Sequence, residues 1–302
     1  PAQGPKFCAG DSHAWAWYRG STVGPYPAMS ALMAVERFAD ELVGLGIPLD
    51  RIVRLLLEGC ENLAMPGLVV GLLVRHLDRV TDELDPWLAN PYVWHLEFSR
   101  ATHERSGPAH NDPDTPGQDR RMDTFREVSG RLVAKALNGG DRQALGRLTA
   151  VAERLVSRAR ELLSEDDVTT VRAWAAALRI EDYQPAEIDG NRGLQAVPPA
   201  DVVEKLAPAS AELERGQAAW RLLHVHTMGS TVPAPDRVRA DLEMAMALGS
   251  EQLPHGPPDR MAPIAGVACS ALASHESGKL VLGSAVISWA TDTIVREALA
   301  TG

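Results

Sequence analysis

The sequence predicts an all-α fold, built either as a stack of helical hairpins (an irregular HEAT-like solenoid) or as a multi-helix bundle. Successive segments place apolar residues at i, i+3, i+4 and i+7, which is the spacing of amphipathic helices. Short turns rich in Gly and Pro separate these segments. No alternation of strands and helices and no series of β-branched strand-length runs occurs. No consensus recurs at a fixed period of about 34 or 40 residues, so any repeat is irregular.

Composition narrows the class of protein further. The chain has 302 residues, of which 45% are hydrophobic, and a formal net charge of −10. This apolar content excludes a disordered chain, and the acidic balance argues against binding nucleic acid by bulk charge. No run of about 18 apolar residues is present, so no membrane span is expected. The three cysteines are far apart and odd in number, which favours a reducing, cytoplasmic compartment over a disulfide framework.

The elements follow in order from an aromatic-rich N-terminal segment, residues 1–26. The first long helix is expected over 27–45, with one inward stripe made of Leu32, Val35, Phe38, Ala39 and Leu42. A second helix begins near the Pro48 turn. Further helices are expected over 66–80, 91–103, 120–137, 141–163, 165–178, 200–228, 234–248, 258–275 and 280–300, with a short helical turn at 85–87. Tryptophans 87, 94, 174, 220 and 289 fall within these patterns and are expected to pack between helices.

Two polar breaks suggest the domain organisation. Residues 107–119 are rich in Pro, Gly and Asp, a composition typical of a loop. They would separate an N-terminal helical subdomain, residues 1–106, from a C-terminal helical subdomain, residues 120–302. A second break at 180–199 interrupts the latter and has room for a short extended segment at 193–197.

The aromatic-rich segment contains the first candidate binding residues, Trp15, Trp17, Tyr18 and Arg19. Trp, Tyr and Arg dominate protein–protein contacts, so these side chains are candidates for a ligand pocket or a partner surface. The alternative is that they close the end of the first helices.

A second candidate set lies on the helix expected at 91–103. His95, Glu97 and Glu104, together with His103, would supply acid–base groups. Helical spacing puts Glu97 and Glu104 on one face but separates His95 from Glu97. A buried Glu97 with a strongly raised pKa would favour an enzyme. Pairing of Glu97 with an arginine, at position 37, 75 or 100, would favour a structural role.

Known catalytic and metal-binding motifs are missing from the sequence. The nearest match to a phosphate-binding loop, at 276–280, lacks its first Gly and its Ser or Thr. The rings of His224 and His226 would point about 200° apart on a helix, so they form no metal pair. Asp166 and Asp167 read as first-turn acids behind the N-cap Ser164. We therefore expect no cofactor, no metal and no catalytic residue in this segment.

One resemblance supplies a functional context for residues 13–105. Its motifs are HAWAWYRGS at 13–21, PYPAMSAL at 25–32, AVER at 34–37, NLAMPGLVVGLLVRHL at 62–77, LDPW at 84–87 and WHLE at 94–97. These motifs resemble the helical region downstream of the P-loop domain in very large bacterial multidomain proteins, the signal-transduction (STAND-like) NTPases linked to stress or phage defence. The resemblance implies that any nucleotide chemistry lies outside this chain. Pro66 and Gly67 in it fit a helix start that another backbone approaches closely.

The sequence therefore favours a non-catalytic helical scaffold or sensor segment of a larger bacterial NTPase. The expected partners are other proteins or neighbouring domains of the same parent chain, with no membrane and no nucleic acid. Because the chain starts with Pro1 rather than Met, we expect it to be a fragment. The alternatives are an all-α enzyme with a dispersed site around His95, Glu97 and Glu104, and a small-molecule-binding helical domain lined by Trp15 and Trp17.

Overall fold

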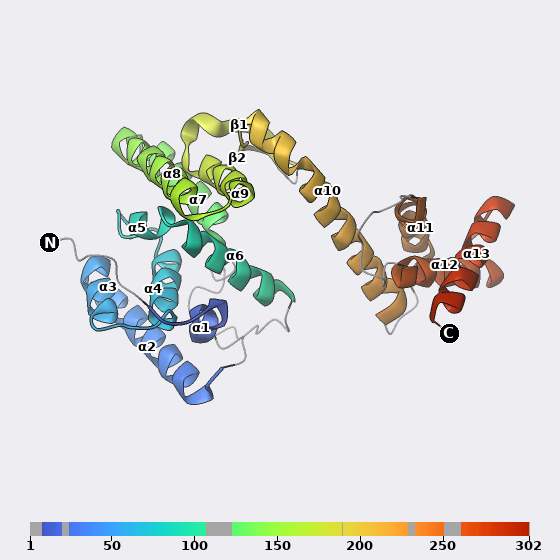
Figure 1. Cartoon of the computed structure of the whole chain (residues 1–302), viewed down its shortest axis with the longest axis horizontal. Coiled ribbons are helices and arrows are strands. Elements are labelled where there is room, and N and C mark those ends of the chain that lie inside the picture. Colours follow the sequence, from blue (N-terminus) through green and yellow to red (C-terminus); the bar gives the residue numbers. More distant parts are fainter. Residues whose placement is uncertain are drawn as a thin grey trace. The chain divides into compact units, whose positions relative to one another are not determined.

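The computed structural model confirms the all-α class. It describes residues 8–19, 24–106, 123–188, 190–228, 233–250 and 261–301, in which thirteen α-helices accompany one two-stranded sheet (Figure 1). The chain forms two compact units, Pro1–Lys205 and Leu206–Gly302. Within the described helices, none combines the length and the hydropathy needed to cross a bilayer.

The first unit begins with six α-helices. They are α1 (Ser12–Ala16), α2 (Tyr26–Gly44), α3 (Leu49–Leu57), α4 (Ala64–Arg75), α5 (Asp85–Leu88) and α6 (Pro91–Ser106), with a 3₁₀ turn η1 (Trp17–Arg19) after α1. Helix α4 stops well before the predicted end at residue 80. Lys135 explains the early end, because its Nζ donates to the carbonyls of Leu77, Asp78 and Val80 at 2.8–3.3 Å. These carbonyls are satisfied without a helix.

Three longer helices complete the first unit. They are α7 (Phe125–Asn138), α8 (Arg142–Leu162) and α9 (Glu165–Ala175), followed by the 3₁₀ turns η2 (Ala176–Leu178) and η3 (Ile180–Asp182). Helix α8 packs against both α7 and α9 (Figure 1). The side chains of Thr124, Asp141 and Ser164 cap the three N-termini. The second predicted break holds a hairpin, β1 (Tyr183–Ile188) and β2 (Asn191–Ala196), rather than one extended segment.

One hydrophobic core joins the helices on both sides of residues 107–119. Trp94 of α6 stacks on Trp174 of α9 at 5.5 Å and meets Phe125 of α7 edge to face at 5.4 Å. The compact units thus divide the chain elsewhere than at the predicted loop 107–119, which lies outside the described residues.

The inward face of α2 differs from the predicted stripe. Phe38 was expected inside, but its side chain is 55% exposed, whereas Glu36 is buried. Glu36 takes the inward place because Arg75 of α4 pairs with its carboxylate at 2.5 Å. Sequence periodicity counts glutamate as polar and therefore rotates the predicted stripe away from the observed one.

The second unit is a smaller helical assembly. It contains most of α10 (Ala200–Leu223), the π-helix η4 (His224–Met228), α11 (Pro235–Ser250), α12 (Met261–Glu276) and α13 (Ser284–Thr301). Its core gathers Leu222, Val238, Leu242, Ile264 and Val267 among others. The prediction that Trp220 packs between helices is wrong, because its side chain is 65% exposed among the described residues. Leu222 lies on the buried face of α10, and Trp220, two positions earlier, lies on a different side of the helix.

Candidate functional site

The two rival sets of candidate residues meet in a single buried cluster. The indole Nε1 of Trp15 donates to Glu97 Oε1 at 2.7 Å. Arg19 makes a two-point contact with Glu104, Nε to Oε1 at 2.5 Å and Nη2 to Oε2 at 2.7 Å. Arg100 lies between the two carboxylates and binds both, at 2.8 Å to Glu97 and 2.9 Å to Glu104. Two arginines thus balance two glutamates, and we call these five residues the Trp15–Glu104 cluster.

Local sequence explains how α1 and η1 reach α6. Asp11 caps α1 by accepting from the backbone N–H groups of His13 and Ala14, both at 3.0 Å. Helix α1 then presses directly on α4, because a Cβ at Gly67 would lie 2.1 Å from the carbonyl oxygen of Trp15. The predicted close backbone approach at Gly67 is therefore confirmed. One turn later, a Cβ at Gly71 would lie 2.6 Å from the Tyr18 hydroxyl.

Helix α6 carries the opposite half of the cluster on one face. Glu97, Arg100 and Glu104 follow at i, i+3 and i+7, so all three side chains point the same way. Arg100 also donates to the carbonyl of Asp123 at 2.9 Å, and so fixes the residue that precedes the N-cap of α7. The Asp123 carboxylate in turn pairs with Arg131 at 2.9 Å. The cluster thereby ties α1, α6 and the start of α7 together.

A second group of charges lies beside the cluster, between α2 and α4. Arg75 pairs with Glu36 at 2.5 Å and with Asp40 at 3.1 Å, and His76 contacts Asp40 at 2.7 Å. Burial would raise the pKa of Asp40, but the hydrogen bond to His76 and the charge of Arg75 lower it below its ordinary value. Asp40 therefore stays ionised.

Two groups at the Trp15–Glu104 cluster, Arg100 and the neighbouring Tyr18, have shifted pKa values. Burial would lower the pKa of Arg100, but Glu97 in particular raises it above its usual value. Burial also raises the pKa of Tyr18 to about 12, so its phenol remains neutral. Neither Arg100 nor Tyr18 is therefore prepared to exchange a proton near neutral pH.

The free space at the cluster decides what it can do. Tyr18, Arg19, Gly71, Glu97 and Arg100 line a cavity of about 10 Å³. One water molecule needs about 10–15 Å³, so this cavity has no room for a substrate. The geometry is that of a packed ion network rather than of a catalytic pocket.

The remaining sequence candidates lie elsewhere. His95 points away from Glu97, as helical spacing predicted, and its ring meets Trp174 edge to face at 4.9 Å. The Trp17 ring lies against Gly24, where a Cβ would come within 2.5 Å of Nε1. Of the four aromatic-segment candidates, Trp15 and Arg19 join the cluster directly, Tyr18 lines its cavity, and Trp17 stays outside it.

Sequence reasoning missed a second buried network, in the unit Leu206–Gly302. Asp241 of α11 accepts from Arg221 at 2.8 Å and Arg237 at 2.8 Å, and contacts His226 Nε2 at 3.1 Å. The other ring nitrogen of His226 lies 3.0 Å from Ser270 Oγ on α12. One part of this network could have been predicted from the sequence, because Arg237 and Asp241 have the i, i+4 spacing of a helical ion pair. The π-turn η4, which directs His226 toward Asp241, has no simple sequence signature.

The order Ser270, His226, Asp241 is that of a hydrolytic triad, but the surroundings differ from a catalytic site. The His226 side chain has no exposed surface. Ser270 lies in the middle of α12, where backbone N–H groups bond within the helix and leave no donors for an oxyanion. A Cβ at Gly266 would lie 2.3 Å from Thr227 Oγ1, so the π-turn packs tightly on α12. The network holds this turn in place.

In the described ranges, no group of three or more His, Cys, Asp or Glu side chains is arranged to hold a metal ion. No protein-family model matches the chain, and no curated protein matches it at a significant level.

Proposed function

We propose that this chain is a non-catalytic helical scaffold or sensor segment that works by protein contact. The observation that supports this role most is the pairing of Glu97 with Arg100 and Trp15 at 2.7–2.8 Å beside a cavity of about 10 Å³. The carboxylates that an acid–base mechanism would need, those of Glu97 and Glu104, are already paired with Arg100 and link neighbouring segments of the fold. The proposed setting is the cytoplasm of a bacterium, within a larger STAND-like NTPase whose nucleotide site lies outside this chain.

Exposed apolar side chains on neighbouring helices support the contact role. In α2, Phe38 is 55% exposed and, just beyond the helix, Leu45 is 80% exposed; in α3, Leu55 is 59% exposed. Large apolar side chains that remain on the surface of adjacent helices are available to bury against another protein. The partner is a neighbouring domain of the parent chain or a separate protein.

The test of the non-catalytic role is turnover by the full 302-residue chain. With ATP and Mg²⁺, we expect no phosphate release above that of a protein-free blank, although binding without turnover is compatible with the proposal. Hydrolysis that Glu97→Gln abolishes, while Glu161→Gln on the exposed face of α8 leaves it unchanged, would establish the enzyme alternative instead.

The contact role has its own measurement. Light scattering of the full chain at rising concentration should show self-association. In the absence of the partner, the exposed apolar side chains of α2 and α3 would be buried against a second copy of the chain. The double variant Phe38→Ser, Leu45→Ser should reduce it, whereas Val281→Ser in the other unit, also exposed at 87%, should not. Association that none of these variants changes would remove this surface from the proposal.

A further inference from the structure

The β1–β2 hairpin has two outer edges, and its register shows which backbone groups each edge presents. Pro185 of β1 lies opposite Leu194 of β2. Just beyond the strands, the N–H of Val197 donates to the carbonyl of Asp182 at 2.9 Å, so these two residues form a hydrogen-bonded pair. Hydrogen-bonded and non-hydrogen-bonded pairs alternate in an antiparallel ladder. The backbone groups that point outward are therefore those of residues 183, 185 and 187 in β1 and of residues 192, 194 and 196 in β2.

The two edges differ in their capacity to pair with another strand. Pro185 occupies the centre of the β1 edge and has no N–H to donate, which is a common way of protecting an edge strand. The β2 edge has no proline. Arg192, Leu194 and Ala196 each present an outward N–H and C=O, and no backbone group in the described ranges bonds to them. The β2 edge is therefore open.

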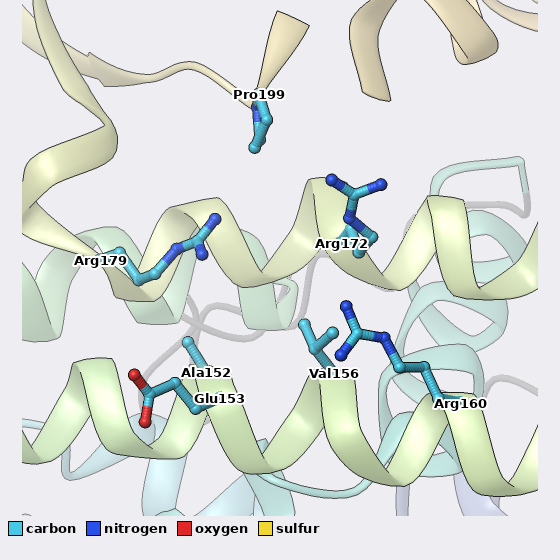
Figure 2. Close-up of a pocket in the computed structure, with 7 residues that line it drawn as sticks. All are labelled: Ala152, Glu153, Val156, Arg160, Arg172, Arg179 and Pro199. Carbon is cyan, nitrogen blue, oxygen red and sulfur yellow. The ribbon is translucent and has the colours of Figure 1, made fainter. Parts of the chain in front are cut away.

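Contacts at both ends of the hairpin hold it against the first unit. The Tyr183 hydroxyl donates to the carbonyl of Ala177 at 2.8 Å. Beyond β2, Pro199 lines a pocket of about 280 Å³ together with Arg172 of α9 (Figure 2), and Arg172 pairs with Asp201 at 2.7 Å. Between these anchors, the side chain of Leu194 is 50% exposed. The open edge is thus held in place and remains accessible.

We propose that the β2 edge pairs with the same edge of a second copy of this chain, in antiparallel orientation. Donors and acceptors that alternate along an edge are matched by another extended strand. A pair centred on Leu194 sets this leucine opposite its own copy and sets Arg192 of one copy opposite Ala196 of the other. The apolar side chains therefore meet, and no two arginines face each other across the strands.

Pro185 favours a closed dimer over an open-ended assembly. The four strands of the dimer would follow in the order β1, β2, β2, β1, so both outer edges would carry the proline that blocks further pairing. The pairing uses none of the exposed apolar residues of α2 and α3. The inference is therefore independent of the scaffold role.

The test is sedimentation equilibrium of the full chain, with reductant, in the Phe38→Ser, Leu45→Ser background, which removes association through α2. We expect a monomer–dimer equilibrium. Leu194→Pro removes an outward N–H that is not part of the ladder to β1, and should weaken the dimer about tenfold or more. Leu194→Thr keeps the N–H and is the matched variant, which should weaken the dimer less. Pro185→Thr opens the β1 edge and should produce species larger than a dimer.

Amide hydrogen exchange, measured by NMR, locates the pairing. The outward amides of Arg192, Leu194 and Ala196 should exchange about tenfold more slowly at concentrations that favour the dimer. Gly193 and Gln195 are the internal controls, because their amides point toward β1 and should change little.

Three outcomes would overturn the inference. The first is a chain that stays monomeric in this background up to about 1 mM. The second is an equal loss of dimer in Leu194→Pro and Leu194→Thr, each shown by thermal unfolding to be folded, because backbone pairing would then contribute nothing. The third is a monomer whose β2 amides slow only when a synthetic hexapeptide of alternating Val and Thr is added, which would assign the edge to a strand of another protein.

Discussion

Trp15 and Glu97 are 82 positions apart in the chain, yet the indole N–H of one donates to the carboxylate of the other at 2.7 Å in a buried setting. A carboxylate away from water needs every donor it has, because an unsatisfied buried charge is costly. This hydrogen bond therefore locks α1 onto α6.

Replacing this donor should cost stability. We expect Trp15→Phe to lower the free energy of unfolding by about 2–4 kcal/mol, from the lost donor to Glu97 and the smaller ring. Urea unfolding followed by far-UV circular dichroism measures the change. Trp220→Phe, at an exposed position, is the control and should stay within about 0.5 kcal/mol. A Trp15→Phe loss no larger than the control would show that the hydrogen bond does not hold α1.

The sequence predicts the fold class and most helix starts, because these depend on local signals. Ser164 caps α9 where expected, and the Gly67 position shows the expected close approach. Such features are decided within a few residues by cap chemistry and by the space that a missing Cβ leaves.

The site was only half predictable. The sequence singled out Trp15 and Glu97 separately, as rivals, because neither residue type nor helical spacing reveals a contact between distant helices. The burial of Glu36 escaped prediction for the same reason, since its partner Arg75 comes from another helix.

Gly67 should tolerate no side chain. In Gly67→Ala the new Cβ would meet the Trp15 carbonyl at 2.1 Å, a backbone atom that cannot swing aside. We expect Gly67→Ala to lower the free energy of unfolding by an amount near the upper end of the usual overpacking cost, which is about 1–3 kcal/mol. Gly44→Ala is the matched control, because nothing lies within 4 Å of its Cβ and it ends α2; it should be neutral or stabilising by up to about 1 kcal/mol. Equal effects of the two variants in thermal unfolding would refute the close approach.

Burial of the Tyr18 phenol should make the free energy of unfolding fall at alkaline pH. Burial raises the pKa of its phenol in the folded protein from 10.0 to about 12. Above pH 10 the unfolded chain releases this proton and the folded chain keeps it, so stability falls as pH rises between these two values. The loss is on the order of 2–3 kcal/mol by pH 12. Tyr18→Phe should flatten that part of the stability curve relative to wild type, and Tyr92→Phe, at an exposed ring, should not. Parallel curves for wild type and Tyr18→Phe would contradict the buried phenol.

The carboxylate of Asp241 should make the stability of the unit Leu206–Gly302 depend on pH in the acidic range. Burial would raise the pKa of this carboxyl, but the hydrogen bonds from His226 and Arg237 lower it below its ordinary value of 3.8. A lowered pKa means that the carboxylate stabilises the folded state above pH 3.8, and that this contribution is lost as pH falls through the folded-state value. We expect Asp241→Asn to cost about 1–3 kcal/mol at pH 7, since its arginine partners are half exposed and can be hydrated.

The same variant also tests the sign of this pH dependence. The difference between wild type and Asp241→Asn, measured by chemical unfolding from pH 7 downward, should shrink once the pH passes below 3.8. Asp236→Asn, at a carboxylate that is 99% exposed on the same helix, should show no such convergence. A difference that stays constant to the lowest pH would mean that Asp241 contributes through shape alone. In that case the π-turn would be held by packing of Thr227 on Gly266, and not by the charge at its centre.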